Sequence, residues 1–329
     1  MKIIIQIPCF NEEKTLPQTL AELPRKIEGI DLVEWLIIDD GSTDHTAEVA
    51  HDMGVDHIIR HNGNKGLAAA FQTGLNACLQ LSADIIVNTD ADNQYPGRYV
   101  SDLVLPILDR KVDMVIADRQ TEKVESFSFS KKIFQRLGSG MVRRLSGTSV
   151  PDAPSGFRAI SREAALRINV LTDFTYTIET IIQAGKKNLK IENIKIKTNA
   201  PQRESRLIRS NWQYILRSST TMIKIFSYYE PLRTFTYISI PFFILGIALW
   251  GRFFLKLLLS DIQRGAHIQS IVVGSGALVI GFLIFLMGML SDIVGINRRL
   301  QEDILYHLKC KTLSKKDDSG NTLKENKKG

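Results

Sequence analysis

Asp90 and Asp92 stand just after a short apolar run of strand character, Ile85 to Val87. Alternate side chains of an extended segment point the same way, so both carboxylates should face one point beyond the strand's end. Two hard oxygen ligands beside an open cleft suit Mg2+ or Mn2+, which completes its coordination with substrate phosphates. The alternative is a loop whose acids only cap helices, and the spacing alone does not decide between the two.

The elements that must position this pair alternate along the first half of the chain. Apolar runs predict strands at 2–7, 33–38, 55–60, 85–87 and 112–117. A first helix should start at Asn11, Glu12 or Glu13 and end near 23, and a second should be capped by Ser42 or Thr43 and end at 53. Two further helices should span about 67–81 and 98–108. A helix at 176–184, stopped by Gly185, and an edge strand at 189–196 follow. This alternation predicts an α/β fold with a mostly parallel, doubly wound sheet. Three strands end in acidic or Gly/Asn turns at one edge, where such sheets bind nucleotides.

Composition narrows the class of protein. The 329 residues suffice for one large domain and an appendage. A formal net charge of +7, from 42 Lys and Arg against 35 Asp and Glu, suits an anionic partner such as a nucleic acid or a phosphate-rich membrane surface. Cys9, Cys78 and Cys310 lack disulfide or metal-ligand spacing and indicate a reducing compartment. The N-terminus is too short and strand-like for a signal peptide, so we expect a cytosolic catalytic part.

Two common nucleotide-binding motifs are absent from the sequence. No G-x-G-x-x-G follows the first strand, and no G-x-x-x-x-G-K-[ST] occurs anywhere. A dinucleotide-binding Rossmann domain and a P-loop NTPase are therefore both disfavoured.

Four motifs occur in a characteristic order: Pro8-Cys9-Phe10-Asn11-Glu12-Glu13, Asp39-Asp40-Gly41-Ser42-Thr43-Asp44, Asn64-Lys65-Gly66 and Thr89-Asp90-Ala91-Asp92-Asn93-Gln94. Together they resemble the motif series of family 2 glycosyltransferases with the GT-A fold. The later Ser155-Gly156-Phe157-Arg158 resembles the polyprenyl-phosphate branch, which includes dolichyl-phosphate mannose and glucose synthases. The resemblance covers roughly residues 1–230.

The resemblance implies roles for the residues near the nucleotide-sugar. The expected donor-binding residues are Pro8, Phe10, Glu12, Asp39, Asp40, Lys65, Asp90, Ala91 and Asp92, and the expected metal ligands for Mg2+ or Mn2+ are Asp90, Asp92 and Gln94. Family members usually have tyrosine where Phe10 stands, so a hydroxyl contact is missing there. Alternatively, Glu12 is a first-turn helix acid, Asp39 and Asp40 are turn residues, and Lys65 is solvated.

On the acceptor side, the resemblance implies that Asp90, Asp92, Arg119 and Asp152 carry the catalysis. The expected contacts to the acceptor phosphate are Arg119, Arg136, Ser139, Arg158, Arg203, Ser205 and Arg206. In the family the aspartate at position 152 is often assigned as a base. A polyprenyl monophosphate is already largely ionised at neutral pH, so we expect Asp152 to orient the acceptor or a neighbouring arginine. Arg158 binds phosphate or pairs with Asp152.

The segments around these acceptor residues carry further information. A basic amphipathic helix within 123–158 suits an anionic membrane surface, although a solvated face of a globular helix gives the same pattern. Residues 201–206 depart from the family's R-x-x-G-x-S-K wording, which weakens the assignment of Arg203 and Arg206. The Q-x-x-R-W motif of processive synthases is missing, so polysaccharide elongation is disfavoured.

The C-terminal part reads as a membrane anchor. We expect a GT-A domain at 1–205, an amphipathic interfacial helix at 206–232, transmembrane helices at about 235–257 and 268–291 within 233–292, and a basic, partly disordered cytoplasmic tail at 293–329. Gly274, Ala277, Gly281 and Gly288 share one face, a small-residue seam for close helix packing that also permits homo-oligomers. Lys and Arg at both outer flanks place the catalytic domain and both termini on the cytoplasmic side.

Three hypotheses remain distinct at this stage. The first is an inverting, metal-dependent transferase that moves one sugar from a UDP- or GDP-linked donor to dolichyl or undecaprenyl phosphate. The second keeps the fold but uses a lipid hydroxyl or a glycan, which would need Asp152 as a true base. The third is a membrane-anchored sugar-nucleotide-binding protein without turnover. A nucleic-acid partner is not expected, because the basic residues cluster beside the apolar segments without a nucleic-acid module.

Overall fold

The computed structural model describes residues 1–120, 129–170, 176–199, 224, 227–259 and 268–325, with backbone only for 129–137, 259 and 314–325. The chain divides into two compact units: Met1–Ile215 with Asp303–Gly329, and Leu216–Glu302. The first unit holds an α/β sheet, and the second holds two long apolar helices.

The sheet of the first unit has seven strands in the order β3-β2-β1-β4-β6-β5-β7. The strands are β1 (Lys2–Cys9), β2 (Leu32–Asp39), β3 (His57–Arg60), β4 (Ile85–Asn88), β5 (Met114–Asp118), β6 (Arg158–Ser161) and β7 (Ile191–Lys195). All neighbours pair in parallel except β6, which is antiparallel to β4 and β5. The predicted mostly parallel α/β sheet and the edge position of β7 are confirmed.

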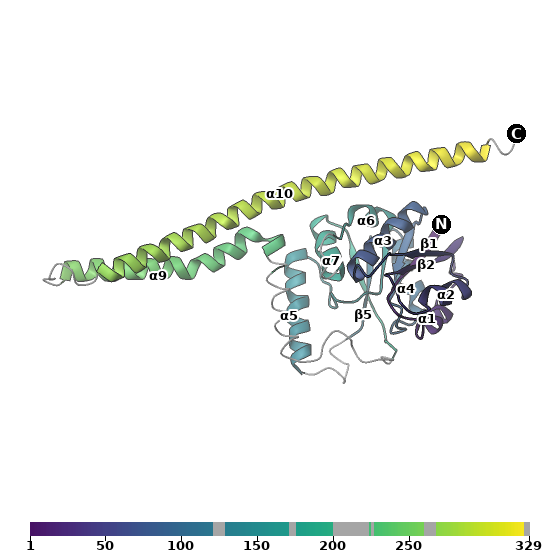
Figure 1. Cartoon of the computed structure of the whole chain (residues 1–329), viewed down its shortest axis with the longest axis horizontal. Helices are drawn as coiled ribbons and strands as arrows, with labels where there is room; N and C mark the ends of the chain where they lie inside the picture. The colour runs from purple at the N-terminus through teal and green to yellow at the C-terminus, as the bar shows by residue number, and fades with distance from the viewer. Residues whose placement is uncertain (121–128, 171–175, 200–223, 225–226, 260–267, 326–329) are drawn as a thin grey trace. The chain divides into compact units, whose positions relative to one another are not determined.

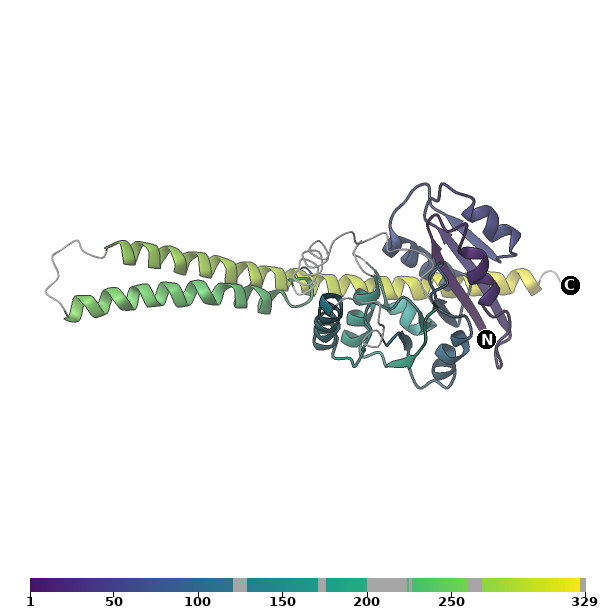
Figure 2. The same ribbon diagram turned by 90° about the horizontal axis from the view of Figure 1, so that it is seen from below.

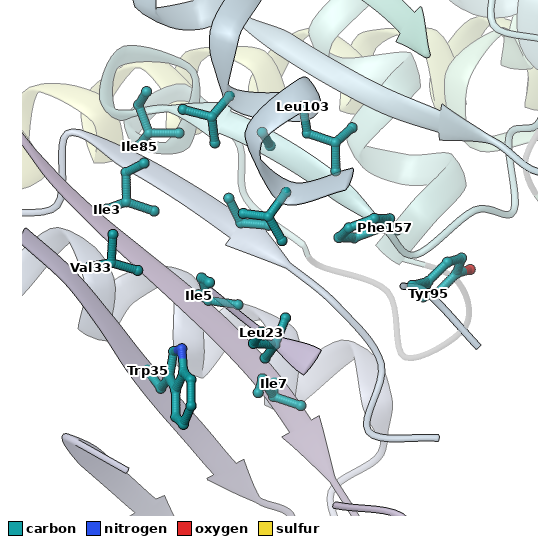
Figure 3. Close-up of a cluster of buried hydrophobic side chains, with 14 of the residues drawn as sticks. Ile3, Ile5, Ile7, Leu23, Val33, Trp35, Ile85, Tyr95, Leu103 and Phe157 are labelled. Carbon is teal, nitrogen blue, oxygen red and sulfur yellow. The ribbon is translucent and has the colours of Figure 1, made fainter. Parts of the chain in front are cut away.

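Helices cover both faces of the sheet (Figure 1). They are α1 (Leu16–Glu22), α2 (Thr46–Asp52), α3 (Leu67–Gln80), α4 (Tyr99–Leu108), α5 (Phe129–Ser146), α6 (Arg162–Arg167) and α7 (Tyr176–Lys186). Ile3, Ile5 and Ile7 of β1 join a core with α1 and α4, as Figure 3 shows for the side of the sheet that carries Leu103. The alternate residue Gln6 faces Gly74 of α3 on the other side.

Two predicted helix starts are wrong for one shared reason. Helix α1 begins at Leu16, not at residues 11–13, because the backbone N–H of Asn11 donates to Ser42 Oγ and that of Glu12 donates to Thr46 Oγ1. These bonds tie the 11–13 segment to the loop after β2. They also use Ser42 there, so neither it nor Thr43 caps α2, which begins only at Thr46.

The predicted stop at Gly185 is also wrong, because α7 continues to Lys186. A Cβ at Gly185 would lie 1.9 Å from the carbonyl oxygen of Ser146, so the glycine is needed for contact between α7 and α5. Within the chain it acts as a packing residue and not as a helix breaker.

Strand β6 was not expected from the sequence, and its direction matters most for the site. Arg158 at its start pairs with Asn88 at the end of β4 and with Ile116 of β5. Because β6 runs opposite to its neighbours, the loop that enters it lies at the edge where parallel β4 and β5 end. The 152–157 loop therefore reaches the carboxyl edge of the sheet.

The second unit contains α9 (Pro231–Leu259) and the first part of α10 (Ile268–Glu325). Both are long and apolar enough to cross a membrane, judged by length and composition. They run side by side (Figures 1 and 2), and a Cβ at Gly274, Gly281 or Gly288 would approach α9 atoms to between 2.7 and 3.2 Å. The predicted small-residue seam between the two helices is confirmed.

Two further predictions concern the ends of this region. The interfacial helix at 206–232 lies largely outside the described residues. The tail after Leu313, predicted to be disordered, instead continues α10 to Glu325. Its composition cannot build a core, but extending an existing helix avoids the cost of nucleation.

Candidate active site

Asp90 lies beyond the end of β4 and against the loop that enters β6. A Cβ built on Gly156 would stand 3.0 Å from each carboxylate oxygen of Asp90. The turn that carries Asp90 and the loop that carries Gly156 lie far apart in the sequence but are thus packed closely together. Burial, followed by the neighbouring charge of Asp92, raises the pKa of the Asp90 carboxyl to about 7. Burial and the neighbouring carboxylate thus both disfavour the charged form of Asp90.

Hydrogen bonds from α1 and within the turn itself hold the turn that carries Asp90 and Asp92. Thr19 of α1 donates its hydroxyl to the carbonyl oxygen of Ala91 at 3.0 Å. The backbone N–H of Gln94 donates to Asp92 Oδ1 at 3.2 Å. Asn93 has a φ of 55°, a left-handed conformation that asparagine tolerates better than most residues. The two carboxylates are consequently presented by a turn with fixed backbone geometry.

Arg119 and Asp152 form a bidentate ion pair beside this turn's edge of the sheet. Arg119 donates from Nε at 2.7 Å and from a terminal nitrogen at 2.9 Å, and its backbone N–H adds a third bond at 3.2 Å. The Asp152 side chain is 2% exposed and that of Arg119 is 19% exposed. The prediction that Asp152 orients a neighbouring arginine has its partner here in Arg119.

Arg158 occupies a different position from the one expected. Its side chain is completely buried and donates to the carbonyl oxygen of Thr177 at 3.2 Å, to Thr180 Oγ1 at 2.6 Å, and to the carbonyl oxygen of Ser155. These partners belong to α7 and to the loop before β6. The sequence-based assignment of Arg158 to the acceptor phosphate is therefore corrected. Its hydrogen bonds join the 152–157 loop to α7.

Sequence reasoning missed four residues around Gly156: two of them bond to it directly, and the other two bond to Asn88. Asn88 donates to the carbonyl oxygen of Gly156 at 2.8 Å and to the Tyr176 hydroxyl at 3.2 Å. The Gly156 N–H donates to the Tyr95 hydroxyl at 3.2 Å, and Gln6 donates to Asn88 Oδ1 at 2.9 Å. Their signal in the sequence was the presence of amide side chains, Gln6 and Asn88, inside otherwise apolar strands.

The two aspartates after β2 have separate partners. Asp39 accepts from the Ser42 N–H at 2.9 Å, and its second oxygen lies 3.1 Å from Arg60 Nε. A pocket of about 450 Å3 opens beside them and is lined by Gly41, Ser42, Thr43, Arg60, His61 and Asn62. This pocket lies at the ends of β2 and β3, and Asp90 is not among its lining residues.

Asp40 organises the neighbouring loop. Its carboxylate accepts from the backbone N–H groups of Lys65 and Gly66 at 2.9 and 2.8 Å, and His61 Nδ1 lies 2.7 Å away. The other ring nitrogen of His61 lies 3.1 Å from Thr73 Oγ1. A direct contact of Asp40 with the nucleotide is thus less consistent with the structure than a role in shaping the loop that carries Lys65.

The remaining predicted donor residues differ in exposure: Pro8 lies in β1, Phe10 and Glu12 follow it, and Lys65 precedes α3. Pro8 is buried, Phe10 is exposed, and the side chain of Lys65 is exposed. Glu12 is buried, and its carboxylate accepts from Thr15 Oγ1 at 2.7 Å, so it stabilises its own turn.

Several predicted acceptor residues have limited or no structural description. Arg203, Ser205 and Arg206 lie outside the described residues, and Arg136 is described only by its backbone in α5. Ser139 is buried, and its hydroxyl has no hydrogen-bond partner within the described part of the chain. These assignments remain predictions.

Known proteins resemble part of this chain. The sequence profile of glycosyl transferase family 2 matches residues 4–168. An uncharacterised protein of Methanocaldococcus jannaschii is 36% identical over 204 residues, which is 60% of this chain and 81% of that protein. The UDP-N-acetylglucosamine–dolichyl-phosphate N-acetylglucosaminyltransferase of Methanococcus voltae is 28% identical and covers 60% and 85%. The dolichol-phosphate mannosyltransferase of Pyrococcus furiosus is 30% identical and covers 58% and 55%.

Solved structures confirm the fold. Glucosyl-3-phosphoglycerate synthase from Mycobacterium tuberculosis, in complex with Mn2+, UDP and glucosyl-3-phosphoglycerate, superimposes with a TM-score of 0.54 at 21% identity, over 69% of this chain and 79% of that chain. A second structure of that enzyme holds Mg2+ and UDP and gives a TM-score of 0.52, at 21% identity and over 69% and 78% of the two chains. At this identity the likeness establishes the GT-A fold alone.

Proposed function

Because the chain belongs to glycosyl transferase family 2, we propose that this glycosyltransferase moves one sugar from a nucleotide-sugar to the phosphate of a polyprenyl phosphate. The relatives named as dolichyl- and dolichol-phosphate transferases support this acceptor class. The observation that carries the proposal is the contact between Gly156 and Asp90. It brings the donor-side acids and the acceptor-side loop to one point at the sheet's edge.

The acids at this point fit a divalent cation. Within the described residues, no group of three or more His, Cys, Asp or Glu side chains could hold a metal ion by itself. Two carboxylates with a raised pKa at Asp90 instead suit a cation that takes its other ligands from phosphate and water. Asp90, Asp92 and Gln94 would hold Mg2+ or Mn2+, which when bound neutralises the charge that develops on the departing diphosphate.

The transfer itself requires little acid–base chemistry from the protein. A phosphate monoester has a second pKa near 6 and is largely ionised at neutral pH. One of its oxygens attacks the anomeric carbon from the side opposite the diphosphate, so an oxygen–carbon bond forms while the carbon–diphosphate bond breaks with inversion. The nearly buried Asp152 carboxylate accepts three hydrogen bonds from Arg119 and so fixes its position. In the proposed reaction, Arg119 binds a substrate phosphate through its remaining donors.

The two apolar helices give the proposed reaction its location. We assign α9 and the apolar part of α10 as a transmembrane hairpin. We propose that the catalytic unit lies on the cytoplasmic side, because the flanks of the hairpin are rich in Lys and Arg. Anchoring in the bilayer keeps the enzyme in the same compartment as its lipid acceptor.

The test uses full-length protein in native membranes with labelled UDP- and GDP-sugars and one polyprenyl phosphate. We expect Asp92→Asn to lower transfer by at least about a hundredfold, as loss of an electrostatic group at a reaction centre typically does. Asp102→Asn, on the exposed first turn of α4, is the matched control and should retain full transfer. Unchanged transfer by Asp92→Asn would refute the metal assignment. Labelled product on a glycan, and not on the lipid phosphate, would refute the acceptor.

A further inference from the structure

The turn that follows Asp92 is secured by a residue from the far edge of the sheet. Asn199 donates its backbone N–H to the carbonyl oxygen of Gln94 at 3.0 Å. Its side-chain amide donates to the carbonyl oxygen of Asn93 at 2.9 Å. A single residue thus fixes two successive carbonyl groups of one turn, which defines both the position and the tilt of the peptide plane between them.

The sheet explains how Asn199 reaches this turn. Strand β7 is parallel to β5, and the pairing continues beyond it because the N–H of Ile196 donates to the carbonyl oxygen of Asp118 at 2.9 Å. The chain after β7 therefore arrives at the carboxyl edge of the sheet. The residues that follow the edge strand consequently end beside the acids that follow the central strand β4.

Glu22, the last residue of α1, completes the arrangement. Its Oε1 accepts from the Asn93 side-chain amide at 2.9 Å, and its Oε2 lies 3.5 Å from the Asn199 amide nitrogen. The turn also packs tightly on the end of α1, because a Cβ at Gly97 would lie 2.1 Å from the carbonyl oxygen of Glu22. Two observations of different kinds, hydrogen bonds and steric contact, thus locate the turn between α1 and Asn199.

We propose that Asn199, assisted by Glu22, is a positioning residue for the proposed metal pair. Asn199 holds the carbonyl group of Gln94, and the N–H group of Gln94 holds Asp92 Oδ1 at 3.2 Å. The position of the Asp92 carboxylate therefore depends on Asn199 through one residue. The inference rests on the proposed function, because it assumes that Asp90 and Asp92 bind a divalent cation.

The experiment measures the affinity of the full-length protein in detergent for Mn2+ alone, by electron paramagnetic resonance of the free ion. Asn199→Asp keeps the backbone bond and the size of the side chain but faces the Asn93 carbonyl and Glu22 with an acceptor. We expect the dissociation constant for Mn2+ to rise roughly tenfold, the effect of about one net hydrogen bond. Glu22→Gln, which keeps an acceptor for Asn93, should change it less than threefold.

Controls separate positioning from general loss of structure. Glu192→Gln lies on the exposed side of β7 and should leave Mn2+ affinity and thermal unfolding unchanged. Asn199→Ala removes the side-chain amide without adding charge. Its Mn2+ affinity therefore tests the inference if the aspartate variant does not fold. A wild-type Mn2+ affinity in folded Asn199→Asp or Asn199→Ala would overturn the inference while leaving the proposed function intact. Absence of Mn2+ binding by the wild-type protein would overturn both.

Discussion

Replacing Gly156 with alanine tests whether the acceptor-side loop and the proposed metal pair share one space. The new methyl group would lie 3.0 Å from both carboxylate oxygens of Asp90 and 2.9 Å from the Tyr176 hydroxyl oxygen. The backbone is held on both sides, because its N–H donates to Tyr95 and its carbonyl group accepts from Asn88. Relief must therefore come from the side chains that the methyl group meets.

The size of the effect follows from these contacts. Ordinary van der Waals contact with a Cβ begins at 3.4 Å, so the Asp90 carboxylate must withdraw by the difference from 3.0 Å, about 0.4 Å. Overpacking a filled site by one methyl group costs about 1–3 kcal/mol. If this cost falls on the arrangement that binds the cation, affinity for Mn2+ decreases about 5- to 150-fold.

The assay is the Mn2+ titration of full-length protein, followed by transfer of labelled sugar at saturating Mn2+. Gly140→Ala in α5 is the matched control, because its methyl group would approach no atom within 3.7 Å. We expect Gly156→Ala to fold, to bind Mn2+ weakly and to recover part of its transfer rate at high Mn2+. A folded Gly156→Ala variant with wild-type Mn2+ affinity would refute the argument that the two segments share one space.

Three further predictions use the same preparation. Asp152→Asn and Arg119→Lys should each reduce transfer by at least about a hundredfold, because breaking a buried ion pair costs about 3–5 kcal/mol and leaves the remaining partner unpaired. The double variant should lose little more activity than either single variant. Additive losses in initial rates would contradict a shared role. Because the pKa of Asp90 is about 7, its carboxyl group is protonated below neutral pH and must lose this proton to bind a cation. Mn2+ affinity should therefore rise from pH 6 to pH 8. A flat profile in calorimetric titrations would argue against Asp90 as a ligand. Gly288→Leu should separate α10 from α9 and lower the unfolding temperature in detergent, whereas Gly276→Leu, with open space around its Cβ, should not; equal effects would show that the seam does not hold the hairpin.

The sheet edge that carries the predicted donor residues was accessible to sequence reasoning for a physical reason. The acids that follow β2 and β4 come after parallel strands, and the ends of parallel strands meet at one edge of the sheet. Chain order and strand endings were therefore enough to predict that these motifs lie at one edge of the sheet. The individual roles were not, because adjacent Asp39 and Asp40 point to different sides of an extended chain and meet different partners.

The acceptor side depended on pairing that no local pattern contains. Strand β6 has four residues and begins inside the motif that carries Arg158, so the sequence offered neither its length nor its direction. The partner of Asp152 was equally hidden. Arg158 is nearer in sequence, but Arg119 follows β5, and antiparallel pairing of β5 with β6 brings it beside Asp152.

The reversed direction of β6 also determines where the segment between β5 and β6 is attached to the sheet. The chain leaves the sheet after β5 and returns at the start of β6 on the same edge, and both ends are fixed by strand pairing. The segment between Asp118 and Arg158 is thus joined to the sheet at two fixed points, and Gly156 near its end lies against Asp90. We expect chimeric proteins joined at β5 and β6 to keep the register of β4 when they retain Gly156 and its contact with Asp90.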